Sequence, residues 1–182
     1  VGPYLNDTFG SDLIERGNII FVVSLAWLVS AICIGPLDRI FDTRRGIVTV
    51  GALSMALWFA VLSAAGNTTV VTVTVAMVLL GLSSGLSSPI FAHVRSLFPD
   101  RYVGRVVTAI NLFIWGGVFL VQVGTGLLID AFPADELGRS PFVAYRVMFA
   151  ALAVLLIAAL LFYRRIEDVP PSRDTGEPDT QT

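Results

Sequence analysis

Three side chains with hydrogen-bonding groups stand out in an otherwise apolar stretch of this chain. Asn111 and Gln122 are amides 11 residues apart, and Trp115 carries an indole N–H one helical turn after Asn111. At about 100° per residue the two amides lie roughly 20° apart around a helix, so they share one face. Such groups either bond to a neighbouring helix or line a water-filled pathway, and the residues leave both interpretations open.

The groups that acid–base or metal chemistry needs are scarce. The chain has one cysteine, Cys33, and one histidine, His93, and no Asp or Glu occurs in its long apolar stretches. A metal centre needs several ligands together, and a catalytic nucleophile needs a base beside it. We therefore expect no metal, no cofactor and no enzymatic activity, and we interpret His93 as a solvated residue at a membrane boundary.

A loop between two apolar stretches concentrates charge. It contains Asp38, Arg39, Arg44 and Arg45. An acid and several arginines at a helix junction can pair with one another and with carbonyl groups at a helix C-terminus, which favours one conformation. The alternative is a basic loop that only anchors the chain on the cytoplasmic side.

Gly81, Gly85 and Pro89 follow one another at intervals of four residues, within a stripe of small side chains on one helical face. Small residues let a second helix approach closely in a membrane. Pro89 lacks a backbone N–H, so it permits a bend. We interpret these three as residues of helix packing or bending, and replacement of Gly85 by Leu should disturb either role.

The composition indicates the environment of the chain. Of its 182 residues, 55% are hydrophobic and 14% are charged, whereas soluble domains average about 25% charged residues. The mean hydropathy is +0.78. Twelve basic residues, all arginine, and fourteen acidic ones leave a net charge of −2, which provides no basic surface for nucleic acid. The sequence predicts an integral membrane protein in a lipid bilayer, with no nucleic-acid partner.

The gaps between ionisable residues define the membrane spans. Uncharged runs of 21, 47, 24 and 17 residues separate charged positions, and a helix needs about 20 residues to cross the hydrocarbon core. The longest run must fold back, and we place its reversal at residues 65–69. The prediction is an all-α polytopic bundle over residues 18–168 with five transmembrane helices. The expected spans are about 18–37, 46–65, 69–92, 106–129 and 142–163.

Polarity separates these helices into two groups. The second and fifth expected spans are apolar on every side, so we expect lipid to surround them. The first, third and fourth carry polar or small residues on one face. Because polar groups in membrane helices point into a bundle or a cavity, we expect these three helices to line an interior.

The charged ends predict the orientation. Nine arginines fall on the side of residues 38–45, 93–105 and the C-terminal tail, and three fall on the other side. Basic short loops stay in the cytoplasm, so we expect the N-terminus outside and the C-terminus inside. Residues 1–17 are expected to form an extracytoplasmic segment that ends a missing earlier helix, which would make the chain a fragment. Residues 169–182 are expected to form a disordered cytoplasmic tail.

Two junctions resemble the major facilitator superfamily. The loop from Gly35 to Arg45 resembles its Gly-x-x-x-Asp-Arg-x-Gly-Arg-Arg motif, with Gly35 one residue closer to Asp38 and with Phe41 where the motif has glycine. The second junction is similar to the one between helices ten and eleven of that superfamily. It comprises Phe98-Pro99-Asp100-Arg101-Tyr102-Val103-Gly104-Arg105, then Thr108, Asn111, Gly116-Gly117 and Gly126 before Asp130.

This resemblance implies that the five spans are helices eight to twelve, in the C-terminal half of a transporter that moves a small solute by alternating access. The implied translocation face contains Asn111, Trp115 and Gln122. The implied cytoplasmic gate contains Asp38, Arg39, Arg44 and Arg45. The expected partners are an unknown small-molecule substrate and the missing N-terminal helices, in a bacterial cytoplasmic (inner) membrane. The alternative is a non-transporting membrane scaffold or accessory subunit.

Overall fold

The computed structural model describes residues 1–66 and 68–172, and all regular elements in these ranges are helical. The elements are α1 Gly2–Phe9, α2 Leu13–Ile34, α3 Leu37–Ile40, α4 Arg44–Ala64, α5 Val70–Ser83, α6 Ser87–Ser96, the 3-10 helix η1 Asp100–Tyr102, α7 Val103–Asp130 and α8 Phe142–Tyr163. Among the described residues, 5 helical stretches are long and apolar enough to cross a membrane. The predicted all-α bundle with five spans is confirmed.

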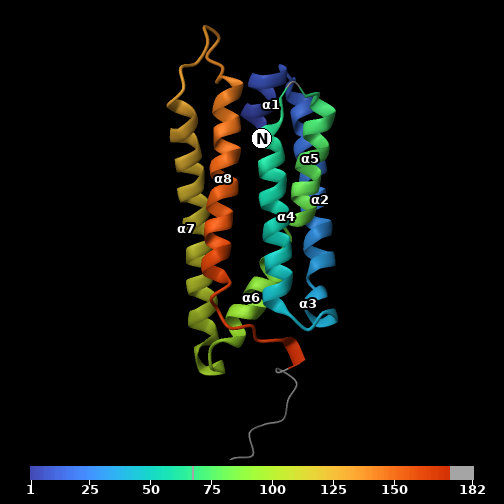
Figure 1. Ribbon diagram of the computed structural model, residues 1–182, viewed down its shortest axis with the longest axis vertical. Coiled ribbons are helices and arrows are strands. Elements are labelled where there is room, and N and C mark those ends of the chain that lie inside the picture. Colours follow the sequence, from blue (N-terminus) through green and yellow to red (C-terminus); the bar gives the residue numbers. More distant parts are fainter. Residues whose placement is uncertain (67, 173–182) are drawn as a thin grey trace, which may run out of the picture.

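The long helices stand side by side, with α1 at one end of the bundle and α3 and α6 at the other (Figure 1). We call these the α1 end and the α6 end. Helices α4 and α8 pack against each other along their length, α5 packs on α4 and α2, and α7 stands at one edge beside α8. The bundle is therefore extended rather than closed around one centre.

The expectation that lipid surrounds the second and fifth spans is wrong for one face of each. Helix α4 buries Ala52, Ala56 and Leu62, and α8 buries Phe149 and Leu160. Residues on their opposite faces remain exposed. Hydropathy could not separate the two faces, because a side chain that contacts lipid and one that contacts another helix are equally apolar.

Side-chain caps set where two of the spans begin. The carboxylate of Asp12 accepts a hydrogen bond from the Glu15 N–H at 2.7 Å, and the hydroxyl of Thr43 accepts one from the Gly46 N–H at 2.9 Å. Each bond satisfies an N–H that has no partner within its helix. Helix α2 therefore begins at Leu13, earlier than the expected start at residue 18, and its first turn contains charged residues.

The third expected span is interrupted. Helix α5 ends at Ser83 and α6 begins at Ser87, so residues 84–86 are not helical. Pro89 has no N–H to donate to the carbonyl of residue 85, which explains a break one turn before the proline. The Ser30 hydroxyl from α2 donates to the carbonyl of Leu82 at 2.5 Å and accepts from the N–H of Gly85 at 2.9 Å. Ser30 thus supplies the hydrogen bonds that the broken helix lacks.

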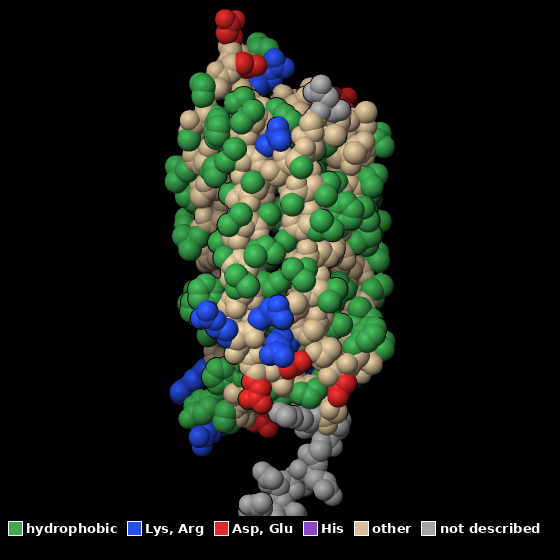
Figure 2. Space-filling model, in the orientation of Figure 1, with side chains coloured by type: hydrophobic (Ala, Val, Ile, Leu, Met, Phe, Trp, Pro, Cys, Tyr) green, Lys and Arg blue, Asp and Glu red, His purple; other side chains and the backbone are tan. Residues whose placement is uncertain are grey.

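The outside of the bundle suits a membrane. Leu112, Phe113 and Val154 each expose about 70% or more of their surface, at 71%, 78% and 69%. On the face shown in Figure 2, charged side chains gather toward the two ends and leave the middle uncharged. An uncharged apolar belt between charged ends is the pattern of a membrane-spanning protein. The chain is an integral membrane protein.

Candidate functional site

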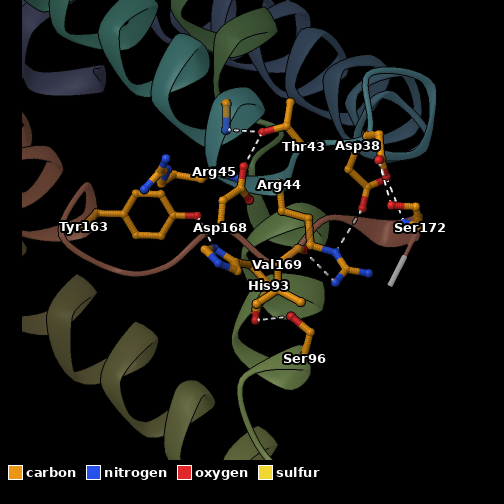
Figure 3. Close-up of polar contacts among 12 residues, drawn as sticks. Asp38, Thr43, Arg44, Arg45, His93, Ser96, Tyr163, Asp168, Val169 and Ser172 are labelled. Atoms are coloured by element: carbon orange, nitrogen blue, oxygen red, sulfur yellow. Dashed lines mark hydrogen bonds and ion pairs between the residues drawn. The ribbon is translucent and has the colours of Figure 1, made fainter. Parts of the chain in front are cut away.

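A cluster of polar side chains at the α6 end joins α3 and the start of α4, the buried face of α6, and the end of α8 with the segment 166–172 that follows it (Figure 3). The carboxylate of Asp168 accepts from the Thr43 hydroxyl at 2.6 Å and from the Arg45 N–H at 3.0 Å. An anion is favoured there, because the N-terminus of a helix carries partial positive charge. The polar cluster comprises Asp38, Thr43, Arg44, Arg45, His93, Tyr163 and Asp168.

Three of the four residues that the resemblance places in a gate belong to the polar cluster. Arg44 is buried, with its Nε 3.6 Å from Oδ2 of Asp38 and its Nη1 donating to the Val169 carbonyl at 3.2 Å. Arg45 donates from Nη1 to a backbone carbonyl of the segment after α8 at 3.1 Å. Arg39 is exposed and forms no side-chain hydrogen bond or ion pair with any described residue.

His93 is fully buried, so its interpretation as a solvated residue is wrong. Its Nε2 lies 2.8 Å from the Glu167 carbonyl oxygen, which can only accept, so Nε2 carries the proton and donates. Its Nδ1 lies 2.6 Å from the Tyr163 hydroxyl and forms the second hydrogen bond of the ring. The sequence placed His93 at a charged boundary, but only the fold brings the segment after α8 across the imidazole.

The loop between α3 and α4 turns at Asp42, whose φ is 48°. Asp is one of the few residue types other than glycine that adopt this left-handed conformation. The carboxylate of Asp42 accepts from the backbone N–H and the hydroxyl of Ser172 at 2.9 and 2.7 Å. The family motif has a glycine at the position of Phe41. In this chain the residue with a positive φ is the next one, Asp42.

We expected a disordered tail from residue 169, but its first residues form hydrogen bonds with the rest of the chain. The carbonyl of Val169 accepts from Arg44, the first residue of α4, and the N–H of Ser172 donates to Asp42 in the turn before α4. The composition argument weighed only how little apolar surface this segment can bury, and it did not count bonds to a helix N-terminus and a turn. Residues 173–182 of the expected tail lie outside the described residues.

Electrostatics keep Asp168 ionised. Burial alone would raise the pKa of its carboxyl group, but hydrogen bonds from Thr43 and the Arg45 N–H, together with the charge of Arg45, outweigh burial. The pKa of Asp168 therefore lies below its ordinary value. A carboxylate that remains charged at neutral pH can hold the start of α4 and the segment after α8 together.

A cavity of about 510 Å³ lies between α2, α4, α5, α7 and α8. Its lining includes Ser24 and Trp27 of α2, Ser84 after α5, and Gln122 and Thr125 of α7. Its apolar wall contains all 3 methionines of the chain, Met55, Met77 and Met148. The residues that line it include no ionisable side chain.

The hydrogen-bonding groups in this cavity are of two kinds. The hydroxyls of Ser24, Ser84 and Thr125 donate to carbonyls of their own helical segments at 2.7–2.8 Å, which leaves their oxygens free to accept. The Gln122 amide has no side-chain hydrogen bond to another described residue. An uncharged solute with hydroxyl groups would find both donors and acceptors here.

The three residues predicted to share a face of α7 do not all reach this cavity. Gln122 lines it, whereas Asn111 and Trp115 lie nearer the α6 end of α7 and are exposed. Asn111 donates from Nδ2 to the carbonyl of Val107 at 3.1 Å, within its own helix. No residue of α7 is buried. The face that the three share is therefore open in this chain.

Sequence reasoning missed several residues that the fold brings into these sites. Trp27 and Ser24 are three residues apart on α2, a helical spacing that could have placed both on the interior face. Thr43 precedes Arg44 as a typical N-cap residue, so its capping role was readable. Nothing in the sequence signalled that Asp168 and Tyr163 meet α4 and His93, because those contacts join residues more than 60 positions apart.

Comparison with known proteins gives a family match over the whole chain. The family model described as Major Facilitator Superfamily matches residues 1–182. The human (Homo sapiens) proton myo-inositol cotransporter is 35% identical over 99 residues. That alignment covers 54% of this chain and 15% of the length of the cotransporter. No solved structure matches the chain.

Proposed function

Because the chain belongs to the Major Facilitator Superfamily, we propose that it forms part of a secondary transporter that moves a small solute by alternating access. The family is not enzymatic, so we assign no reaction. The observation that carries the proposal is the cavity beside Gln122, where uncharged donors and acceptors lie within an apolar bundle. Such a cavity can bind a solute without a fixed charge.

The translocation pathway in this proposal runs along the open face of α7. Gln122 contacts the solute in the cavity, and Asn111 and Trp115 line the pathway toward the α6 end. The exposure of all three supports this role, because polar groups in a membrane helix face water or protein in preference to lipid. The missing wall would come from the N-terminal helices of the complete transporter.

The gate in this proposal lies at the α6 end and contains Asp38, Arg39, Arg44 and Arg45. Its support is the polar cluster, in which Arg44 and Arg45 join the α3–α4 region to the segment after α8. These parts would move as one unit when the cytoplasmic side opens. We assign the five spans to helices eight to twelve, in the C-terminal half, with Gly81, Gly85 and Pro89 shaping the packing and bend of helix ten.

A neutral polyol is the first class of solute to assay. The cotransporter that shares 35% identity with this chain is described as carrying myo-inositol with protons. The cavity offers hydroxyl and amide groups and its lining has no ionisable residue, which fits an uncharged polyol. None of the five expected spans contains an Asp or Glu. A carboxylate that couples transport to protons would therefore lie elsewhere in the protein.

The decisive experiment measures water access along α7 and needs no substrate. In a Cys33→Ala background of the full chain, cysteines at 111, 115 and 122 are exposed in turn to a membrane-impermeant thiol reagent in vesicles. A cysteine at Val154, on the exposed face of α8, is the control in contact with lipid. We expect labelling at 111, 115 and 122 and none at 154.

Absence of labelling at 111 and 122 would favour the alternative, a membrane scaffold or accessory subunit without a pathway. Once a transported solute is found, Asn111→Ala and Gln122→Ala should lower its transport rate or its affinity. Unchanged values for both variants would remove these residues from the pathway while leaving the transporter proposal itself standing.

A further inference from the structure

A hollow of about 630 Å³ opens at the α6 end, between the α3–α4 region and the turn from α6 to η1. Three arginines line it, Arg39, Arg44 and Arg95, and Asp100 is the one acid among its lining residues. Arg44 is already bonded within the polar cluster. Arg39 and Arg95 are exposed and form no side-chain bond with a described residue. This arginine hollow therefore presents two guanidinium groups to an anion.

An apolar groove of about 570 Å³ adjoins the hollow. We call it the α6–α7 groove. Phe98 lines both the hollow and the groove, so the two are adjacent. The walls of the groove are formed by Val94, Phe98, Val106, Ala109, Ile110 and Phe113. Arg105 is its only charged lining residue, and Tyr102 lies beside Arg105 at the same end of the groove.

The charges along α7 indicate how deep the arginine hollow and the α6–α7 groove lie in the membrane. Arg105 is the last ionisable residue before 24 uncharged ones, so it marks the boundary of the hydrocarbon. From there to Phe113 the groove rises along the helix by about 12 Å at 1.5 Å per residue. The groove thus runs from the headgroup level into the hydrocarbon, and the hollow lies at the headgroup level.

We propose that this site binds one anionic phospholipid, with its phosphate in the arginine hollow between Arg39 and Arg95 and one acyl chain along the α6–α7 groove. Arginine suits a phosphate because its planar guanidinium donates two parallel hydrogen bonds. A soluble anion would use the hollow but would leave the groove empty. Basic pockets beside membrane helices are typical places for acidic headgroups. The inference is independent of which solute the protein carries.

The experiment counts lipids that remain bound to the full chain, purified in detergent, by native mass spectrometry after addition of phosphatidylglycerol or phosphatidylcholine. We expect retained phosphatidylglycerol and little phosphatidylcholine. Arg39→Gln/Arg95→Gln should weaken phosphatidylglycerol binding about fivefold for each arginine removed. Arg95 lies outside the proposed gate. Arg95→Gln alone should weaken phosphatidylglycerol binding about fivefold.

Two matched controls separate the site from general attraction of lipid to charge. Arg164→Gln/Arg165→Gln removes two arginines at the same membrane boundary but outside the hollow, and it should retain phosphatidylglycerol like the wild type. Ala109→Trp fills the groove and should displace the lipid, whereas Ala151→Trp on α8 should not. Thermal melting of every variant confirms that it is folded.

Two results would overturn the proposal. The first is equal retention of phosphatidylglycerol by the wild type and by Arg39→Gln/Arg95→Gln. The second is binding of inorganic phosphate to the hollow, measured by calorimetry in phosphatidylcholine nanodiscs, together with no effect of Ala109→Trp on bound lipid. That second pattern would make the hollow a site for a soluble anion.

Discussion

At the scale of single residues, two side chains hold together segments that are far apart in the sequence. Ser30 bridges the break between α5 and α6 by donating to Leu82 and accepting from Gly85. Asp168 accepts from Thr43 and Arg45 at the start of α4. Each accepts from a backbone N–H at a helix terminus or break that has no partner within its own helix.

Replacement of Ser30 by Ala should destabilise the protein by about 1–3 kcal/mol, because the buried Gly85 N–H and the partly buried Leu82 carbonyl lose their partner. The matched control is Ser24→Ala, since the Ser24 hydroxyl bonds only to Ile20 of its own helix. We expect the control to change the free energy of unfolding by less than about 0.5 kcal/mol. Titration with a denaturing detergent measures both. Equal effects of the two variants would contradict the bridging role of Ser30.

The contacts of Asp168 should weaken at low pH. Its pKa is lowered in the folded protein, so the stabilisation is complete above the ordinary pKa of 3.8 and is lost as the pH falls through the lower folded value. A spin label at Pro170 should therefore gain mobility only as the pH falls below 3.8, and Asp168→Asn should give that mobility already at pH 7. A label that is equally mobile in wild type and variant at pH 7 would show that the carboxylate does not hold the segment.

At the scale of elements, the third span shows how a glycine and a proline divide one membrane helix into two. Pro89 removes a backbone hydrogen bond, and Gly85 lies so close to α2 that a Cβ atom there would be 2.6 Å from the Ala31 nitrogen. At Gly81 an added Cβ would be 3.0 Å from the Val23 carbonyl oxygen. The small residues therefore serve close packing against α2, and the break lies where that packing is tightest.

Gly85→Ala should be destabilising by roughly 1–3 kcal/mol, because the added methyl meets backbone atoms that cannot move aside. Gly117→Ala on α7 is the control, since a Cβ atom there meets nothing within 4 Å. We expect the control to be neutral or more stable by up to about 1 kcal/mol, from its better helix propensity. Melting curves in detergent compare the two variants. A Gly85→Ala protein as stable as wild type would mean that α2 and the break can separate.

At the scale of the whole molecule, a carboxylate fastens the chain at each end of the bundle. At the α1 end, Asp7 accepts from the Tyr145 hydroxyl at 2.6 Å and from the Ser140 N–H at 3.1 Å. Burial would raise the pKa of Asp7, but these hydrogen bonds outweigh it and lower the pKa. At the α6 end, Asp168 has the corresponding role. Between them the helices meet mainly through apolar contacts.

The expected orientation can be tested with reporter fusions to the full chain. Nine arginines against three predict that the α6 end lies in the cytoplasm. A fluorescent protein fused after Ser172 should therefore fold and fluoresce. Alkaline phosphatase inserted at Leu137, in the loop before α8, should be active because that loop is outside. Active phosphatase after Ser172 and none at Leu137 would reverse the assignment.

The sequence by itself determined the class of the protein and the number of its spans. Charge costs so much in hydrocarbon that the uncharged runs alone mark the helices, whatever their neighbours are. Local signals contributed less: Pro89 predicted a bend where the structure has a break, and Thr43 before Arg44 is a typical helix start that our reading of the sequence did not use. The face shared by Asn111 and Gln122 also follows from helical spacing, because α7 is continuous from Val103 to Asp130.

Only the tertiary structure decided which helices touch and which distant residues meet. Lipid and helix interior are both apolar, so hydropathy could not predict that α4 packs on α8. Only the fold buries His93 under the segment after α8, brings Asp168 to Thr43 and forms the cavity beside Gln122, and each of these joins residues from separate parts of the chain. Such contacts depend on the paths of the whole chain, whereas spans and caps depend on a few neighbouring residues.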